Sequence, residues 1–235
     1  MNIFWRLVLG HFLADFTLQF DVVARLKRKN FWGMLLHCLT HYAASVALTW
    51  PYMGDVWVTV WGLPVSGWWA QFLMFATHLA IDETRLYSMR VGYRDNTLSF
   101  LVDQALHIYV LFMITPVFQQ RTLQQGGKWV MIAAMFVLVT HFTTVLIYFV
   151  EKDLYGKAFP CFDEKYFLMF ERLVLWAFFF VPGHWWLPFA VAWAVQMLWV
   201  KRKRIMDMSG VNVLISAAMS MMLGALSRVY YYGSF

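Results

Sequence analysis

Residues 130–150 read VMIAAMFVLVTHFTTVLIYFV, a stretch without any Asp, Glu, Lys or Arg. An α-helix needs about 20 predominantly apolar residues to cross the hydrocarbon core of a bilayer. This stretch is long enough, and further apolar runs lie at 71–80, 106–118 and 167–181. The sequence therefore predicts an all-α integral membrane protein.

The composition of the whole chain also indicates a membrane protein. Apolar residues make up 61% of the chain and charged residues 14%, and the mean hydropathy is +0.57. A soluble domain usually has about a quarter charged residues. The first apolar stretch begins at Ile3 without a preceding basic region, so we expect it to remain as a helix rather than to be cleaved as a signal peptide.

We predict a polytopic bundle of about eight transmembrane helices, at 3–24, 31–50, 68–87, 98–118, 129–150, 166–182, 185–200 and 205–227. Most of the 19 Lys and Arg residues follow the first, third, fifth and seventh of these helices. Basic connections stay in the cytoplasm, so both termini are predicted outside it. The net charge of +6 then reflects topology and predicts no nucleic-acid partner. Residues 53–67 are expected to form a loop or a helix on the outer surface.

Most of the histidines share one pattern. Each histidine of the first four predicted helices has a His or Asp partner four positions away: His11 with Asp15, His37 with His41, His78 with Asp82, and His107 with Asp103. Residues four apart lie on the same face of a helix. The two side chains of each pair can therefore bind the same ion or group.

The four pairs also recur in order. HFLAD at 11–15 resembles HLAID at 78–82, and LLHCLTHY at 35–42 resembles LVDQALHIY at 101–109. This similarity predicts a duplicated helical hairpin. Both hairpins run the same way across the membrane, which predicts a pseudo-two-fold axis along the membrane normal and brings all four pairs around one centre.

Ionisable groups inside a bilayer are costly and are usually kept for a function. Imidazole and carboxylate together suit zinc, our first choice, and also iron or manganese. We predict one or two divalent ions, with two preferred, held by His11, Asp15, His37, His41, His78, Asp82, Asp103 and His107. Gln19, Gln104 and His141 are candidates for partners that orient these ligands.

The motifs GHFLADFTLQ at 10–19, HCLTH at 37–41 and DQALH at 103–107 carry a resemblance. They resemble a family of bacterial inner-membrane proteins known only as a domain of unknown function, whose pattern is G-H-x-L-A-D-F-x-L-Q, H-x-x-x-H and D-Q-x-x-H. The resemblance covers residues 1–118. It implies a bacterial inner membrane and supplies no reaction.

Two regions follow from these patterns: a four-helix repeat domain with the metal site at 1–118, and further transmembrane helices of unknown role at 119–235. The first functional hypothesis is a metal-dependent hydrolase of a lipid-like or isoprenoid-phosphate substrate from the membrane, with Asp82 or Asp103 as the catalytic base. The alternatives are a cation or proton transporter that uses the same centre, and a structural subunit of a membrane complex.

Overall fold

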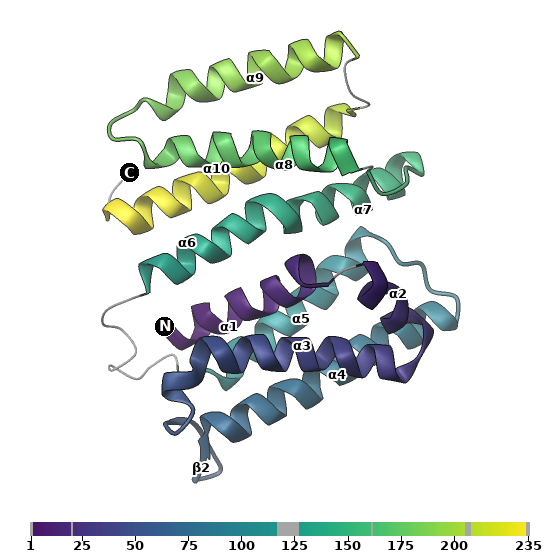
Figure 1. Ribbon diagram of the computed structural model, residues 1–235, viewed down its shortest axis with the longest axis vertical. Coiled ribbons are helices and arrows are strands. Elements are labelled where there is room, and N and C mark those ends of the chain that lie inside the picture. The colour runs from purple at the N-terminus through teal and green to yellow at the C-terminus, as the bar shows by residue number, and fades with distance from the viewer. Residues whose placement is uncertain (1, 20, 117–126, 161, 205–207, 234–235) are drawn as a thin grey trace. The chain divides into compact units, whose positions relative to one another are not determined.

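The computed structural model describes residues 2–19, 21–116, 127–160, 162–204 and 208–233 (Figure 1). These residues are predominantly α-helical, which confirms the predicted fold class. They form two compact units, Met1–Ala134 and Met135–Phe235, which are described separately.

The first unit is a ring of four helices with a short helix beside it. Its elements are α1 (Asn2–Phe12) with the π-helix η1 (Leu13–Thr17), α2 (Asp21–Lys29), α3 (Phe31–Thr49), the 3-10 turn η2 (Trp50–Tyr52), β1 (Val56–Val60), β2 (Leu63–Ser66), α4 (Gly67–Arg90), α5 (Thr97–Ile114) and the start of α6 (Lys128–Val137). Helices α1 and α4 each pack against both α3 and α5, and Figure 1 shows the four side by side. The ring has one shared interior.

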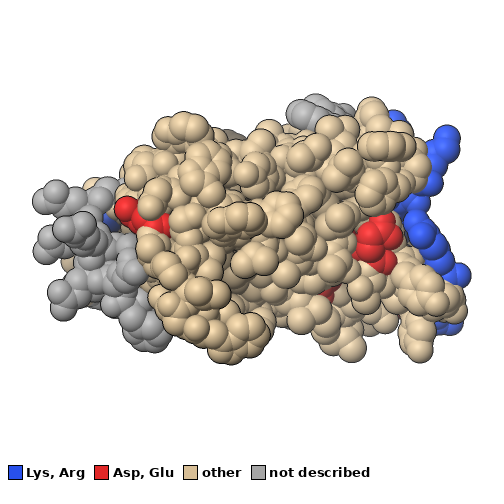
Figure 2. All heavy atoms as spheres, turned by 90° about the horizontal axis from the view of Figure 1, so that it is seen from below, with Lys and Arg blue, Asp and Glu red and all other residues tan. Residues whose placement is uncertain are grey.

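The helices of this ring are apolar outside and polar inside. In α5, Leu98, Val102 and Leu106 are exposed, whereas Asp103 and His107 are buried. A helix of a soluble protein has the opposite arrangement, because its apolar stripe faces the core. In Figure 2 the broad middle of the visible face carries no basic side chain, and the Lys and Arg atoms gather toward one end. This distribution suits a surface in contact with lipid.

The first predicted span, 3–24, is interrupted in the structure. Its helix ends at Thr17, and α2 begins at Asp21, bent by 92° from the first helix. Helix α2 carries Arg25, Lys27, Arg28 and Lys29. A basic amphipathic helix is more stable along a membrane surface than across the bilayer. The predicted span 3–24 therefore contains two helices rather than one.

Residues 53–67 form neither the expected loop nor a surface helix. They contain an antiparallel hairpin, in which Val60 of β1 pairs with Leu63 of β2. The two residues between the strands, Trp61 and Gly62, have φ angles of +49° and +82°. Two successive positive φ values are typical of the tight turn that matches the twist of a hairpin. The β-branched run Val56–Val60 supplies the strand.

The second unit is built around its last helix. It contains η4 (Leu138–Phe142), α7 (Thr143–Tyr155), α8 (Phe162–Ala177), the 3-10 turn η5 (Phe178–Phe180), α9 (Trp186–Arg202) and α10 (Gly210–Tyr232). Helix α10 packs against α7, α8 and η5. A Cβ atom at Gly224 would overlap the ring of Phe179, so the absence of a side chain allows this close approach.

Among the residues that the structure describes, three helices are long and apolar enough to cross a membrane: Thr97–Ile114, Lys128–Tyr155 and Gly210–Tyr232. A fourth is reached if Asn2–Thr17 and Val22–Lys29 form one broken span. These lengths fit a hydrocarbon core of about 30 Å at 1.5 Å per residue.

Candidate metal centre

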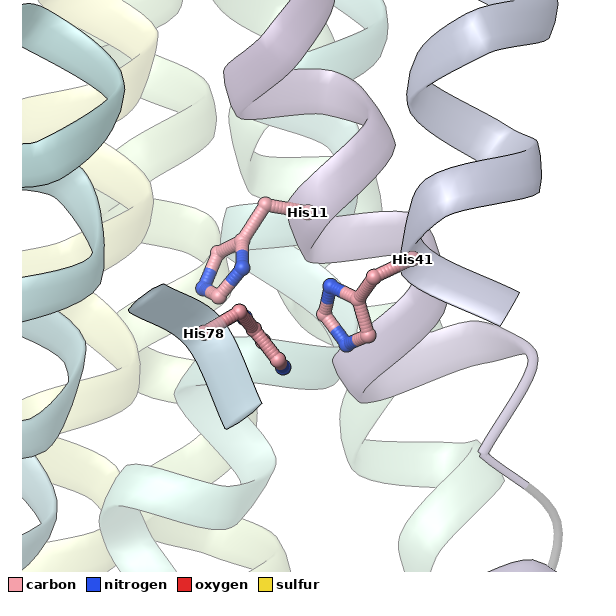
Figure 3. A group of neighbouring side chains, drawn as sticks. All are labelled: His11, His41 and His78. Atoms are coloured by element: carbon pink, nitrogen blue, oxygen red, sulfur yellow. The ribbon is translucent and has the colours of Figure 1, made fainter. Parts of the chain in front are cut away.

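The ring of helices brings five imidazoles into one cluster. The ring centroids of His41 and His78 are 4.0 Å apart, and those of His78 and His107 are 4.3 Å apart. His11 lies 5.1 Å from both His41 and His107, and His37 lies 4.6 Å from His41. Figure 3 shows His11, His41 and His78 directed toward one another from α1, α3 and α4. The cluster occupies the interior of the ring.

Three aspartates complete the cluster from the same helices. The three predicted His–Asp pairs are each held together: His11 lies 3.5 Å from Asp15, His78 lies 3.3 Å from Asp82, and His107 lies 3.9 Å from Asp103. The side chains of Asp82 and Asp103 are only 3% and 5% exposed. Burial of carboxylates to this degree requires compensation by cations or hydrogen bonds.

Asp15 is placed by a local change in helix geometry. In η1 the Leu18 N–H donates to the Leu13 carbonyl at 2.7 Å, a bond that spans five residues and widens the turn. Single π-helical turns are found frequently at functional sites. The Oδ1 atom of Asp15 lies 3.1 Å from His41 Nε2 and 3.4 Å from His37 Nε2, so it joins α1 to α3.

One group of three ligand atoms has the dimensions of a metal site. His37 Nε2, His78 Nε2 and Asp82 Oδ2 are separated by 3.3, 3.3 and 3.5 Å. Ligands that lie about 2.0–2.1 Å from a tetrahedral zinc ion are separated by about 3.4 Å. The three atoms therefore match one face of such a tetrahedron.

Lys27 reaches this group from α2. Its Nζ atom lies 2.8 Å from Asp82 Oδ2 and 2.9 Å from His37 Nε2. Although Asp82 Oδ2 is close enough to Lys27 for an ion pair, it has no partner with hydrogen-bond geometry among the described residues. The ammonium group thus supplies charge to a carboxylate whose lone pairs it does not fully use.

A second group contains atoms that lack partners. Asp82, Asp103 and His107 can each present a ligand atom within 4.8 Å of the others. Asp103 Oδ1 and His107 Nε2 are buried and have no hydrogen-bond partner in the part of the chain that the structure describes. Arg85 binds the other oxygen of Asp103 at 3.0 Å. Buried acceptors without a partner are rare and suggest a bound group at that place.

Two further groups connect these to the rest of the cluster: His11 with His41 and His78, and Asp15 with His37 and His41. The four groups together include all eight residues that the sequence predicted as ligands. Asp82 belongs to two of them. A shared carboxylate is suited to join two adjacent ions.

The residues predicted to orient the ligands have different surroundings. Gln104 donates from Nε2 to Asp15 at 3.0 Å and to Asp103 at 3.2 Å, and its Oε1 lies 3.3 Å from His11. Gln19 lines a small pocket of about 80 Å³ together with Lys27 and Asp82. His141 belongs to the second unit, where its Nδ1 lies 3.0 Å from Thr140 Oγ1. Its participation stays a prediction.

Sequence reasoning missed Lys27 and Arg85, which it used only to assign topology. Arg85 carried a detectable signal, because it lies three residues after Asp82 and so shares a face of α4. Lys27 carried none. It reaches the centre only because the chain bends between η1 and α2.

The fold and the cluster define an α-helical protein with spans suited to a membrane and a buried His/Asp centre. The chain belongs to the family described as "Protein of unknown function (DUF3307)", whose model matches residues 3–131. This match includes all eight predicted ligands as well as Lys27 and Arg85. Neither a search of curated proteins nor a search of solved structures finds a match to this chain.

Proposed function

We propose that this protein is a membrane-embedded metalloprotein whose His/Asp centre binds one or two divalent ions, zinc above all. The observation that carries the proposal is the triangle of His37 Nε2, His78 Nε2 and Asp82 Oδ2, with edges of 3.3–3.5 Å. Two nitrogens and one carboxylate oxygen are typical of catalytic zinc sites, which keep a fourth position for water or substrate.

The charges of the centre support a cation. Asp15, Asp82 and Asp103 carry negative charge. Lys27 is paired with Asp82, and Arg85 is paired both with Asp103 and with Asp95, whose own charge is shared with Arg28. Imidazoles must be neutral to act as metal ligands. One negative charge therefore stays uncompensated before any ion is bound. A divalent ion over-compensates this charge while both resident cations stay, and neutralises it if one of them withdraws; a second ion requires in addition that an anion enters.

We further propose that the centre hydrolyses a lipid-like or isoprenoid-phosphate substrate. A bound divalent ion would polarise an acyl or phosphoryl oxygen and activate a water molecule. The pocket of about 80 Å³ supports access, because Asp82 lies in its lining and it has room for a few water molecules. Asp82 or Asp103 would act as the base that accepts the proton of that water.

The direct test is metal analysis of the purified protein, followed by assays of phosphate release and fatty-acid release after loading with zinc or manganese. We expect about one or two ions per chain, and hydrolysis that Asp103→Asn lowers by at least about 100-fold. A protein that binds no divalent ion would contradict the whole proposal. Metal without hydrolysis of either substrate class would contradict only the reaction.

One observation favours a transporter as the second candidate. The first helix is broken between Thr17 and Asp21, two residues beyond Asp15, and transporters often place broken helices at their ion sites. Flux of a divalent ion into liposomes that contain the protein, with the Asp15→Asn variant as control, distinguishes transport from hydrolysis.

We also propose a bacterial inner-membrane location, eight spans with both termini outside the cytoplasm, and a duplicated hairpin. The closed order α1, α3, α4, α5 around the ring and the matched ligand pairs support the duplication. Reporter fusions after Lys29, Arg94 and Arg204 should report cytoplasm, and one between residues 120 and 128 should report the outer side. A cytoplasmic signal from the last fusion would contradict this topology.

A further inference from the structure

Lys27 lies beside the atoms that a metal ion would bind in the His37–His78–Asp82 triangle. Its ammonium contacts two of the three atoms that form the triangle, at 2.8 Å from Asp82 and 2.9 Å from His37. Its side chain is 17% exposed, so it reaches the centre from near the surface. Lys is a compact point charge on a flexible stem, and can substitute for an ion at one place and withdraw to another.

The ammonium and a divalent ion exclude each other. The ion would need the lone pairs of His37 Nε2 and Asp82 Oδ2, to which the Lys27 nitrogen is already adjacent. Two cations about 3 Å apart repel each other strongly in an interior where water screens little. Occupation by metal therefore requires that Lys27 moves.

The structure offers a place for the displaced group. The pocket of about 80 Å³ adjoins Lys27, and its polar lining consists of Gln19, Asp82, Asp95, Arg28 and Arg85. The amide oxygen of Gln19 is an acceptor for an ammonium group. The carboxylate of Asp95 already pairs with Arg85 at 2.8 Å and lies 3.9 Å from Arg28, so Lys27 would share it with these two cations. Lys27 belongs to α2, a short helix that is bent by 92° from the preceding helix, Asn2–Thr17. Small rotations of the side chain, or of α2, would take the ammonium from the centre into the pocket.

We propose that Lys27 is a built-in counter-ion that occupies the cation position of the His37–His78–Asp82 group and is displaced into the neighbouring pocket when a metal ion binds. This inference rests on the proposed metal binding and adds a regulation of it. Lys27 also sets the affinity of the centre, because each binding ion must overcome its ion pair with Asp82.

Amine labelling of the wild-type protein tests the displacement. The purified full chain is reductively methylated with and without manganese or zinc, and each lysine is followed by mass spectrometry. Metal should raise the rate of Lys27 modification severalfold and leave that of Lys29, an exposed residue of the same helix, unchanged. Metal binding with an unchanged rate at Lys27 would overturn this inference alone.

Metal titration of Lys27→Met, with Lys29→Met as the matched control, tests the competition. A charge-assisted contact of this kind corresponds to about a 10- to 100-fold change in a binding constant. We expect Lys27→Met to bind zinc about 10- to 100-fold more tightly than the wild type, and Lys29→Met to bind it equally. Equal or weaker binding by Lys27→Met would overturn the competition. Absence of metal binding in all three proteins would overturn the proposed function and this inference together.

Discussion

Both units place cations between their helices, partly exposed in the first unit and buried in the second, and they compensate them in different ways. In the first unit, Lys27 and Arg85 contact the carboxylates of Asp82 and Asp103. In the second, Arg172 and Arg228 are 1% and 7% exposed, and neither contacts a carboxylate among the residues that the structure describes. Arg172 donates to the Thr140 carbonyl and contacts Thr144 and Ser216.

The difference separates a structural use of charge in the second unit from the metal binding that we propose for the first unit. Arg228 donates to the carbonyls of Phe179, Val181 and Gly183, which follow the end of α8 and cannot bond within a helix. It therefore stabilises the turn before α9. The centre of the first unit has more acidic and imidazole groups than its two cations need, and some of its acceptors have no partner among the described residues. Such an excess suits a bound ion.

The largest effect is expected from the loss of the shared carboxylate. Asp82→Ala removes a ligand common to two of the four groups, so metal affinity should fall by more than the 10- to 100-fold typical of residues that only orient ligands. Calorimetric titration with zinc measures it. Asp153→Ala, in α7 of the second unit, is the control and should bind metal as the wild type does. If Asp82→Ala bound zinc as tightly as the wild type, the proposal that the first unit uses its charges to bind metal would be contradicted.

The buried arginines of the second unit should differ in their contribution to stability. Arg228→Met leaves three carbonyls without their donor and should lower the free energy of unfolding by roughly 3 kcal/mol. Arg172→Met should change it by less than about 1 kcal/mol, because Thr144 still donates to the Thr140 carbonyl and a desolvated charge is removed. Denaturant titration in detergent gives both values.

Neither arginine substitution should change the affinity for metal. A loss of metal on Arg172→Met, at unchanged stability, would show that the second unit takes part in the centre. It would also support the predicted role of His141, which follows Thr140 directly.

Gln104 tests whether the centre depends on groups that do not bind the ion. Gln104→Ala removes hydrogen bonds to Asp15 and Asp103 and should weaken zinc binding by about 10- to 100-fold. Gln196→Ala, which loses a similar bond to Glu171 in the second unit, is the matched control and should have no effect on metal. Equal affinities of the two variants would contradict the orienting role.

A further effect concerns the contact that keeps α2 beside the centre. A Cβ atom at Gly33 would overlap the backbone carbonyl of Leu26, so Gly33→Ala must displace α2 from α3. We expect a loss of about 1–3 kcal/mol in the free energy of unfolding. Gly54→Ala, where a Cβ meets nothing within 4 Å, should cost less than about 0.5 kcal/mol. Equal costs would show that α2 is not held by this close approach.

The sequence by itself determined the helical class and which residues meet. Long apolar runs with few charges favour helices, because a helix satisfies its own backbone hydrogen bonds in lipid. The spacing of four residues fixed that His37 and His41, or His78 and Asp82, share a face. Since these faces are the most polar parts of their helices, they had to turn inward. The convergence of eight side chains follows from local rules applied to four helices.

Only the tertiary structure decided what completes the centre. The bend after Thr17 returns α2 toward α3 and brings Lys27 to Asp82, a contact between residues 55 positions apart that no helical period encodes. The hairpin at 56–66 likewise depends on two positive φ angles that the apolar composition concealed. Periodicity reports which residues share one helix face, whereas the partners of that face depend on how the chain turns between helices. For this reason the cluster of His and Asp side chains was predictable from the sequence, and the contact of Lys27 with it was not.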